Sequence, residues 1–185
     1  MNISIPNLAR SGLAALLLLG TAAQAALQVG ARAPDFKAEA ALGGQGFAFH
    51  LATALKEGPV VLYFYPKAFT SGCTIEAKRF ADATPQFKQL GATVIGMSND
   101  DIATLKKFSV EACRSRFAVA ADAGAKVMKD YDAALRIVPG MADRISYLIT
   151  PDGRIAAVHE SMNPDGHVDA MLQALQRWKS GAAKP

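Results

Sequence analysis

The sequence has few of the residues from which metal and redox sites are usually built. Its 185 residues include two cysteines, three histidines and one tryptophan. The cysteines stand far apart, so no Cys-x-x-Cys dithiol exists, and no histidine is evidently placed as the base of a cysteine hydrolase. The histidines are too scattered for the common zinc patterns. The sequence therefore argues against these classes, and we expect neither a metal nor a cofactor.

Dense runs of one charge are also absent. The formal net charge is +4, from 20 basic and 16 acidic residues spread along the chain. Proteins that bind nucleic acid usually cluster their lysines and arginines. We therefore expect no nucleic-acid partner.

The first 25 residues have the pattern of a secretory signal peptide. Arg10 is the only charge before the apolar run Leu13–Leu19, and Ala23-Gln24-Ala25 fits an A-x-A cleavage site. The apolar run is shorter than a membrane span, so a retained anchor is the weaker alternative. We expect cleavage after Ala25, export to the periplasm, and a single domain over residues 26–185 with a formal charge of +3.

The strongest local pattern begins with the apolar run Val60–Tyr65. Continuous β-branched and aromatic residues predict a buried parallel strand, and Pro66 ends it because proline has no N–H to donate. Ser71-Gly72 predicts a turn, and Thr70 or Ser71 can cap a following helix. Cys73 then lies at a helix N-terminus, where backbone N–H groups and the helix dipole favour a thiolate. It is a candidate nucleophile.

The remaining sequence alternates strand and helix patterns. Residues 26–46 read as an extended segment with a turn at 43–46. Further strands are expected at 47–51, 92–98 and 117–121, helices at 73–90, 102–112, 126–131 and 168–178, and a hairpin at 144–159. Thr84-Pro85 predicts that the first of these helices is kinked or restarted. This order predicts an α/β fold, a mixed central sheet flanked by helices.

Two segments carry a family resemblance. The residues Pro66-Lys67-Ala68-Phe69-Thr70-Ser71-Gly72-Cys73 have the form P-x-x-x-T-x-x-C, which resembles the active-site motif of peroxiredoxins. The segment Arg144–Gly153 resembles the strand that carries the family's active-site arginine, and the chain is most similar to the bacterioferritin-comigratory (PrxQ) branch. The resemblance implies a thioredoxin-like fold and reduction of hydrogen peroxide or organic hydroperoxides, with a thioredoxin-like dithiol protein as reductant. We expect a monomer or a weak homodimer.

The family pattern also implies roles for single residues. Cys73 would be the peroxidatic cysteine, Thr70 would orient the peroxide, Arg144 would supply fixed positive charge, and Pro66 would shape the pocket and exclude water. Each has a simpler alternative: a helix cap, a surface arginine, a strand stop. The hypothesis requires that Arg144 points toward Cys73 and that a small oxidant reaches the sulfur.

Three further residues are expected on the substrate side of the site. The backbone N–H of Gly72 would receive developing negative charge. Phe69 would line an apolar rim. Glu76 would lie near the arginine, although it could simply complement the helix dipole.

Cys113 is the only candidate for a resolving cysteine. Many relatives place this cysteine five residues after the peroxidatic one, where this chain has Lys78. Other members carry it in the helix after the second strand, so the resemblance predicts an intramolecular Cys73–Cys113 disulfide. Two alternatives stay open: a one-cysteine enzyme in which Cys113 is a buried apolar residue, and a thioredoxin-fold binding or scaffold protein with a permanent disulfide.

Overall fold

The structure is a computed structural model that describes residue 1 and residues 26–181. The predicted signal peptide, with its cleavage site, lies outside the described residues. The elements in chain order are β1 (Lys37–Leu42), β2 (Gln45–His50), α1 (Leu51–Glu57), β3 (Val60–Phe64), α2 (Ser71–Gln89), β4 (Thr93–Ser98), α3 (Ile102–Glu111), β5 (Ala118–Ala121), α4 (Lys126–Asp130), β6 (Ile145–Ile149), β7 (Ile155–Glu160) and α5 (His167–Lys179). None of the helices in this part of the chain is both long and apolar enough to cross a membrane.

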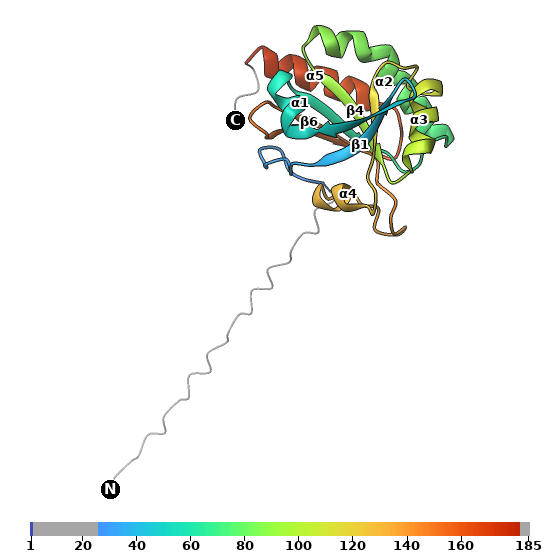
Figure 1. Cartoon of the computed structure of the whole chain (residues 1–185). Helices are drawn as coiled ribbons and strands as arrows, with labels where there is room; N and C mark the ends of the chain where they lie inside the picture. The colour runs from blue at the N-terminus through green and yellow to red at the C-terminus, as the bar shows by residue number, and fades with distance from the viewer. Residues whose placement is uncertain (2–25, 182–185) are drawn as a thin grey trace.

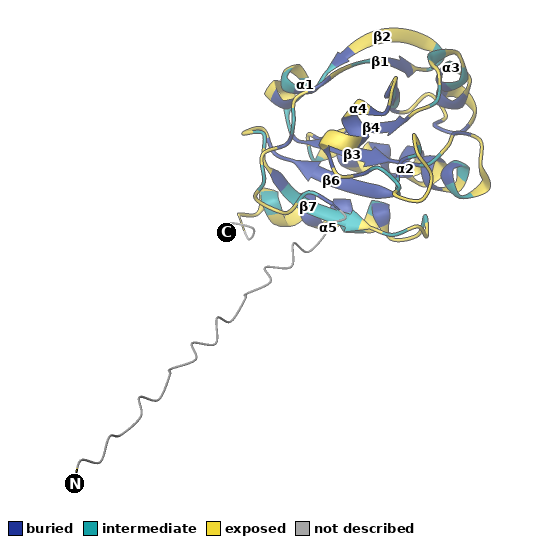
Figure 2. Cartoon of the chain, turned by 90° about the horizontal axis from the view of Figure 1, so that it is seen from below, coloured by how far each residue is buried: buried dark blue, intermediate teal, exposed yellow. Residues whose placement is uncertain are grey.

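The described strands form one seven-stranded sheet in the order β2-β1-β5-β4-β3-β6-β7. The central strand β3 is parallel to β4 and antiparallel to β6, and β4 is parallel to β5. The central strands are buried, whereas the outer strand β2 is largely exposed (Figure 2). The predicted α/β fold with a mixed, helix-flanked sheet is confirmed.

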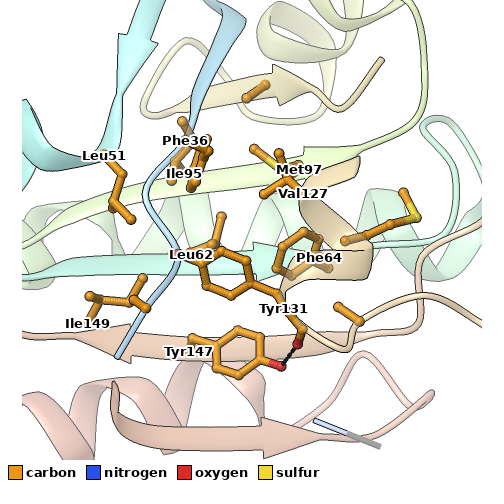
Figure 3. Packing of buried hydrophobic residues seen from close by; sticks show 14 of the residues in the cluster. Phe36, Leu51, Leu62, Phe64, Ile95, Met97, Val127, Tyr131, Tyr147 and Ile149 are labelled. Atoms are coloured by element: carbon orange, nitrogen blue, oxygen red, sulfur yellow. Dashed lines mark hydrogen bonds between the residues drawn. The ribbon is translucent and has the colours of Figure 1, made fainter. Parts of the chain in front are cut away.

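Alternate residues of β3 serve two separate cores. Val60, Leu62 and Phe64 join one core, which α1 and α4 cover. In that core the hydroxyl of Tyr147 donates to the carbonyl of Tyr131 at 2.7 Å (Figure 3). The other face of the sheet packs against α2, α3 and α5, and both cysteines belong to this second core. In Figure 1, α5 and α2 lie near the top of the molecule and α4 near the bottom.

The N-terminal part of the domain differs from the sequence prediction. The segment expected to be merely extended contains β1, which pairs with β2 and with β5. The strand expected over 47–51 ends at His50, and α1 begins at Leu51. Leu51 and Leu55 are both buried, and their spacing of four residues is the helical signal behind this helix.

Helix α2 is one continuous helix through Pro85, so the restart that the sequence offered as one possibility does not occur. Thr84 does not cap a restarted helix. It is buried, and its hydroxyl donates to the carbonyl of Phe80 at 2.8 Å. Packing of Phe80 and Phe87 in the core, with ring centroids 6.0 Å apart, holds the helix together across the proline.

Candidate active site

The loop between β3 and α2 is held against the end of β4. Asp100 accepts hydrogen bonds from the Ala68 N–H and the Ser98 hydroxyl, both at 2.8 Å. Phe69 has a left-handed backbone, with φ of 64°, and its ring packs edge-on against Phe108 at a centroid distance of 5.2 Å. These contacts fix the path of the motif residues before the helix begins.

The first turn of α2 offers unpaired N–H groups. Thr70 occupies the N-cap position, and its carbonyl accepts from the Thr74 N–H at 2.9 Å. The N–H groups of Gly72 and Cys73 therefore precede the first bond of the helical ladder. These N–H groups belong to the first turn of the helix that carries Cys73.

Thr70 does not make the expected cap hydrogen bond through its side chain. Its hydroxyl instead donates to the carbonyl of Lys67 at 2.9 Å. A hydroxyl whose hydrogen is held in this way keeps its lone pairs available as acceptors. The side chain can therefore accept a hydrogen bond from an O–H group of a bound molecule.

Arg144 directs its guanidinium at the sulfur. The residue precedes β6, and its side chain lies on the same face of the sheet as Ser146, in contact with α2. Its Nη2 lies 3.4 Å from Cys73 Sγ, its Nε donates to the carbonyl of Met162 at 3.0 Å, and its Nη1 donates to Glu76. Arg144 is 4% exposed and Glu76 is fully buried. The contacts with Met162 and Glu76 thus hold the Arg144 guanidinium against the Cys73 sulfur.

Burial governs the electrostatics of this cluster. It raises the pKa of Glu76 to about 7, although the neighbouring Arg144 acts in the opposite direction. For Arg144, burial acts to lower the pKa, but the charges of Glu76 and Cys73 outweigh it and raise the pKa. The guanidinium therefore stays charged at any physiological pH.

The Cys73 sulfur is more enclosed than the sequence suggests, since the residue is only 1% exposed. The neighbouring Phe69, Thr70 and Ser71 are exposed. The open path to the sulfur that the hypothesis requires is therefore closed in this conformation.

Pro66 lines a surface hollow beside the motif rather than the sulfur itself. The hollow has a volume of about 210 Å³, and its opposite wall includes Val138 and Met141. Phe69 is 45% exposed and lies outside this lining. Glu76 lies beneath Arg144 and faces no solvent, so its contact is with the arginine and not with a bound substrate.

Cys113 lies just after the end of α3, as expected, and is a free buried thiol. Burial raises its pKa. The two following residues, Arg114 and Ser115, both have left-handed backbones, with φ of 51° and 55°. Arg114 also pairs with Asp82 of α2 at 2.5 Å. The thiol is thus followed by a strained turn that is tied to the helix carrying Cys73.

Sequence reasoning missed a polar layer below the arginine. The His167 Nδ1 lies 2.8 Å from the Ser146 hydroxyl and 3.6 Å from Glu76 Oε1, and its ring meets that of His159 edge-on at 4.5 Å. The sequence prediction left all three histidines without a role. The available signal was weak: His167 begins the last helix, and only the packing of α5 against α2 brings it to Glu76.

The described residues contain no group of three or more His, Cys, Asp and Glu side chains arranged to hold a metal ion. What they do contain is a buried cysteine at a helix start with a guanidinium against its sulfur. On a mixed sheet flanked by helices, this defines a thioredoxin-fold protein that sets one thiol against a fixed positive charge.

Comparisons with known proteins identify the family. Residues 29–158 match the AhpC/TSA family. The chain is 35% identical over 122 residues to a chloroplastic peroxiredoxin Q of Suaeda salsa; the match covers 65% of this chain. The structure is also similar to the crystal structure of Peroxidoxin BcpB from Mycobacterium tuberculosis, with a TM-score of 0.73 and 30% sequence identity. The match covers 81% of this chain and 97% of that one. The chain belongs to the AhpC/TSA family and is a peroxiredoxin of the PrxQ branch.

The same fold also occurs in proteins of more distant sequence. AhpC of Mycobacterium tuberculosis has a TM-score of 0.74 at 21% identity, which supports the thioredoxin fold alone. The match with the peroxiredoxin Q of Suaeda salsa spans 56% of that protein's length.

Proposed function

We propose that this chain is a thiol-dependent peroxidase that reduces hydrogen peroxide and organic hydroperoxides through Cys73. The single observation that carries the proposal is the contact of 3.4 Å between Arg144 Nη2 and Cys73 Sγ. A guanidinium so placed favours the thiolate, and the thiolate is the nucleophile in this chemistry. Membership of the peroxiredoxin family supports the same reaction.

The geometry suggests how the chain lowers the barrier. The Cys73 thiolate attacks one peroxide oxygen, the O–O bond breaks, and the product is Cys73 sulfenic acid with an alkoxide or hydroxide that takes a proton from water. Thr70 accepts the peroxide O–H, while Arg144 and the N–H groups of Gly72 and Cys73 stabilise the oxygens as charge shifts. Preorganised donors of this kind contribute about 3–4 kcal/mol each to a transition state.

Cys113 completes the proposed cycle. Its thiol attacks the sulfenic acid of Cys73, water leaves, and an intramolecular disulfide forms. Both cysteines are buried, so the end of α3 and the start of α2 must open locally first. The strained residues Arg114 and Ser115 favour opening at the Cys113 end. A thioredoxin-like dithiol protein then reduces the disulfide.

We further propose that the protein acts outside the cytoplasm, in the periplasm, after loss of its first 25 residues. The support is the sequence pattern around Arg10 and Ala23-Gln24-Ala25. Expression of the full chain in a Gram-negative host tests this. A periplasmic protein whose N-terminal residue is Ala26 is the expected result, and an uncleaved cytoplasmic chain would contradict it.

The peroxidase proposal is tested by peroxide consumption. The purified domain is mixed with hydrogen peroxide and a dithiol, and Cys73→Ser is expected to abolish turnover. Equal rates for the variant and the wild type would refute the proposed nucleophile.

The resolving step has its own measurement. Non-reducing peptide mapping after one equivalent of peroxide should give a linked Cys73–Cys113 peptide. A lasting sulfenic acid on Cys73 beside a free Cys113 would instead identify a one-cysteine enzyme. A disulfide that exists before peroxide is added, without turnover, would identify the scaffold protein.

A further inference from the structure

The polar layer below Arg144 contains one carboxylate oxygen with no hydrogen-bond partner. Glu76 is fully buried, and only its Oε2 is bonded, to Arg144. Its Oε1 has no hydrogen bond among the described residues. Burying an ionised oxygen without a partner is costly, so the site favours a proton there.

His167 presents an acceptor to that oxygen. Its Nε2 lies 2.9 Å from the carbonyl of Ser161, which can only accept, so Nε2 carries the ring hydrogen. In the neutral ring, Nδ1 is then an acceptor with a single lone pair, for which the Ser146 hydroxyl at 2.8 Å competes with Glu76. Nδ1 lies 3.6 Å from Glu76 Oε1, which exceeds an ordinary hydrogen-bond length by less than about 1 Å. A proton on Oε1 can point into this gap when the Ser146 hydroxyl turns its own hydrogen away from Nδ1.

The charge count explains why such a proton matters to Cys73. If the Cys73 thiolate and the Glu76 carboxylate were both ionised, two negative charges would share the one guanidinium of Arg144. A proton held on Glu76 leaves one thiolate against one guanidinium, a neutral pair. Because net charge is costly in a buried cluster, ionisation of the thiol and retention of this proton favour each other.

We propose that Glu76 and His167 hold one proton between them beneath Arg144, and that this proton reserves the arginine's charge for the Cys73 thiolate. His167 is then a positioning residue that acts on the sulfur through Glu76 and Arg144. The inference deepens the proposed peroxidase function and rests on it for its biological meaning.

The other titratable groups around the pair agree with this placement. Burial raises the pKa of Glu76 to about 7 and lowers that of His167 to about 4, so the shared proton belongs to the carboxyl side near neutral pH. His159 of β7 faces the His167 ring at 4.5 Å and, if charged, would further disfavour charge there. Tyr63 of β3 interacts with Glu76, but burial raises its pKa and keeps it neutral.

The test follows the pH profile of Cys73 alkylation by iodoacetamide, with Cys113→Ser as the parent so that one thiol reacts. His167→Gln keeps a donor toward Ser161 but removes Nδ1. We expect the alkylation midpoint to rise by about one pH unit, which is roughly tenfold slower alkylation below the midpoint. His50→Gln, at the exposed Asp35 pair, is the matched control and should leave the profile unchanged.

The decisive arm uses Glu76→Gln, whose neutral amide imitates the protonated carboxyl. In this background His167→Gln should no longer move the midpoint, because the proton that it managed is gone. An equal shift in both backgrounds would overturn the proposal, and so would no shift in the parent. Alkylation needs no peroxide. A wild-type chain without peroxide turnover would therefore refute the proposed function, while the pH profile of Cys73 alkylation would still test the role of His167.

A second measurement needs no change at His167, in case that variant fails to fold. The ring nitrogens and Cε1 of His167 are followed by NMR as the reduced protein is titrated. They should show the Nε2–H tautomer and a step at the pH midpoint of Cys73 alkylation, and Cys73→Ser should lack that step. His167 signals that show no step at the pH midpoint of Cys73 alkylation, in the chain without substitutions, would overturn the proposal.

Discussion

A β-carbon added to Gly72 would lie 3.1 Å from Nη2 of Arg144. This is tighter than an ordinary van der Waals contact, and the guanidinium has little freedom to retreat. Its Nη1 is bonded to Glu76 and its Nε to the carbonyl of Met162. The absent side chain of Gly72 therefore makes room for the arginine's approach to Cys73.

Gly72→Ala should accordingly slow the reaction of Cys73 while leaving the fold intact. Alanine favours the helix over glycine by up to about 1 kcal/mol, so stability should hold or rise. The added methyl displaces Nη2, and we expect roughly a tenfold loss in the rate of alkylation or peroxide reaction. Stopped-flow kinetics with a thermal melt check both parts, and Ser71→Ala is the control at the neighbouring exposed position. A variant as reactive as wild type would contradict this account of Gly72.

Removing the arginine should separate stability from reactivity. Arg144→Met leaves the buried, protonated Glu76 without its hydrogen-bond partner, which costs about 1–3 kcal/mol. Peroxide reaction should fall about a hundredfold as the charge at the sulfur is lost. Adding Glu76→Gln to the same chain should restore most of the stability in urea unfolding without restoring the rate. Recovery of the rate by the double variant would show that Arg144 serves the fold alone.

The strained turn after Cys113 gives a prediction about disulfide formation. Ser115 has a φ of 55°, where a non-glycine residue costs about 1–2 kcal/mol, less about 0.5–1 kcal/mol for the greater chain entropy of glycine. Ser115→Gly should therefore stabilise the domain by about 0.5 kcal/mol and slow formation of the Cys73–Cys113 disulfide about twofold. Asp132→Gly, also at a left-handed position, is the control: it should stabilise without slowing. Unchanged disulfide kinetics in Ser115→Gly would remove the strain from the proposed cycle.

Stability between pH 4 and 7 should reveal two opposed slopes. The folded-state pKa of Glu76 is raised from 4.5 to about 7, so its contribution is present at low pH and is lost as pH rises through this window. The folded-state pKa of His167 is lowered from 6.5 to about 4, so its contribution is lost as pH falls through that range. In the wild type the two effects largely cancel.

Single variants should each expose one slope in urea unfolding across this range. Glu76→Gln leaves His167, so the variant should lose stability on acidification. His167→Gln leaves Glu76 buried but without its acceptor, so that variant should still lose stability as pH rises from 4.5, over a narrower range that ends below pH 7. The double variant should be nearly flat. Slopes of the opposite sign would show that the buried groups are ionised in the fold.

Local patterns predicted most of the fold because they carry their own periodicity. The apolar run of β3, the helix α3 and the hairpin of β6 and β7 all formed where the sequence indicated. β1 could not be found this way, since its sequence Lys-Ala-Glu-Ala-Ala-Leu consists largely of good helix formers. Pairing with β2 and β5 makes it a strand, and that pairing is invisible to a local pattern.

The candidate site divides in the same way. The motif from Pro66 to Cys73 is contiguous, and its resemblance to a family supplied Arg144 as well. The orientation of Arg144 toward the sulfur, which the hypothesis required, is what the structure shows. The full burial of Glu76 and its approach to His167 depend on how α5 packs against α2, and no spacing in the sequence expresses that contact.

The place of His167 has a practical consequence for anyone trimming this protein. The segment that matches the AhpC/TSA family ends at residue 158, nine positions short of that histidine. A fragment that ends at residue 158 would keep the motif and Arg144 but lose His167, which lies below Arg144. Such a fragment would still match the family and yet be a poor substitute for the full chain.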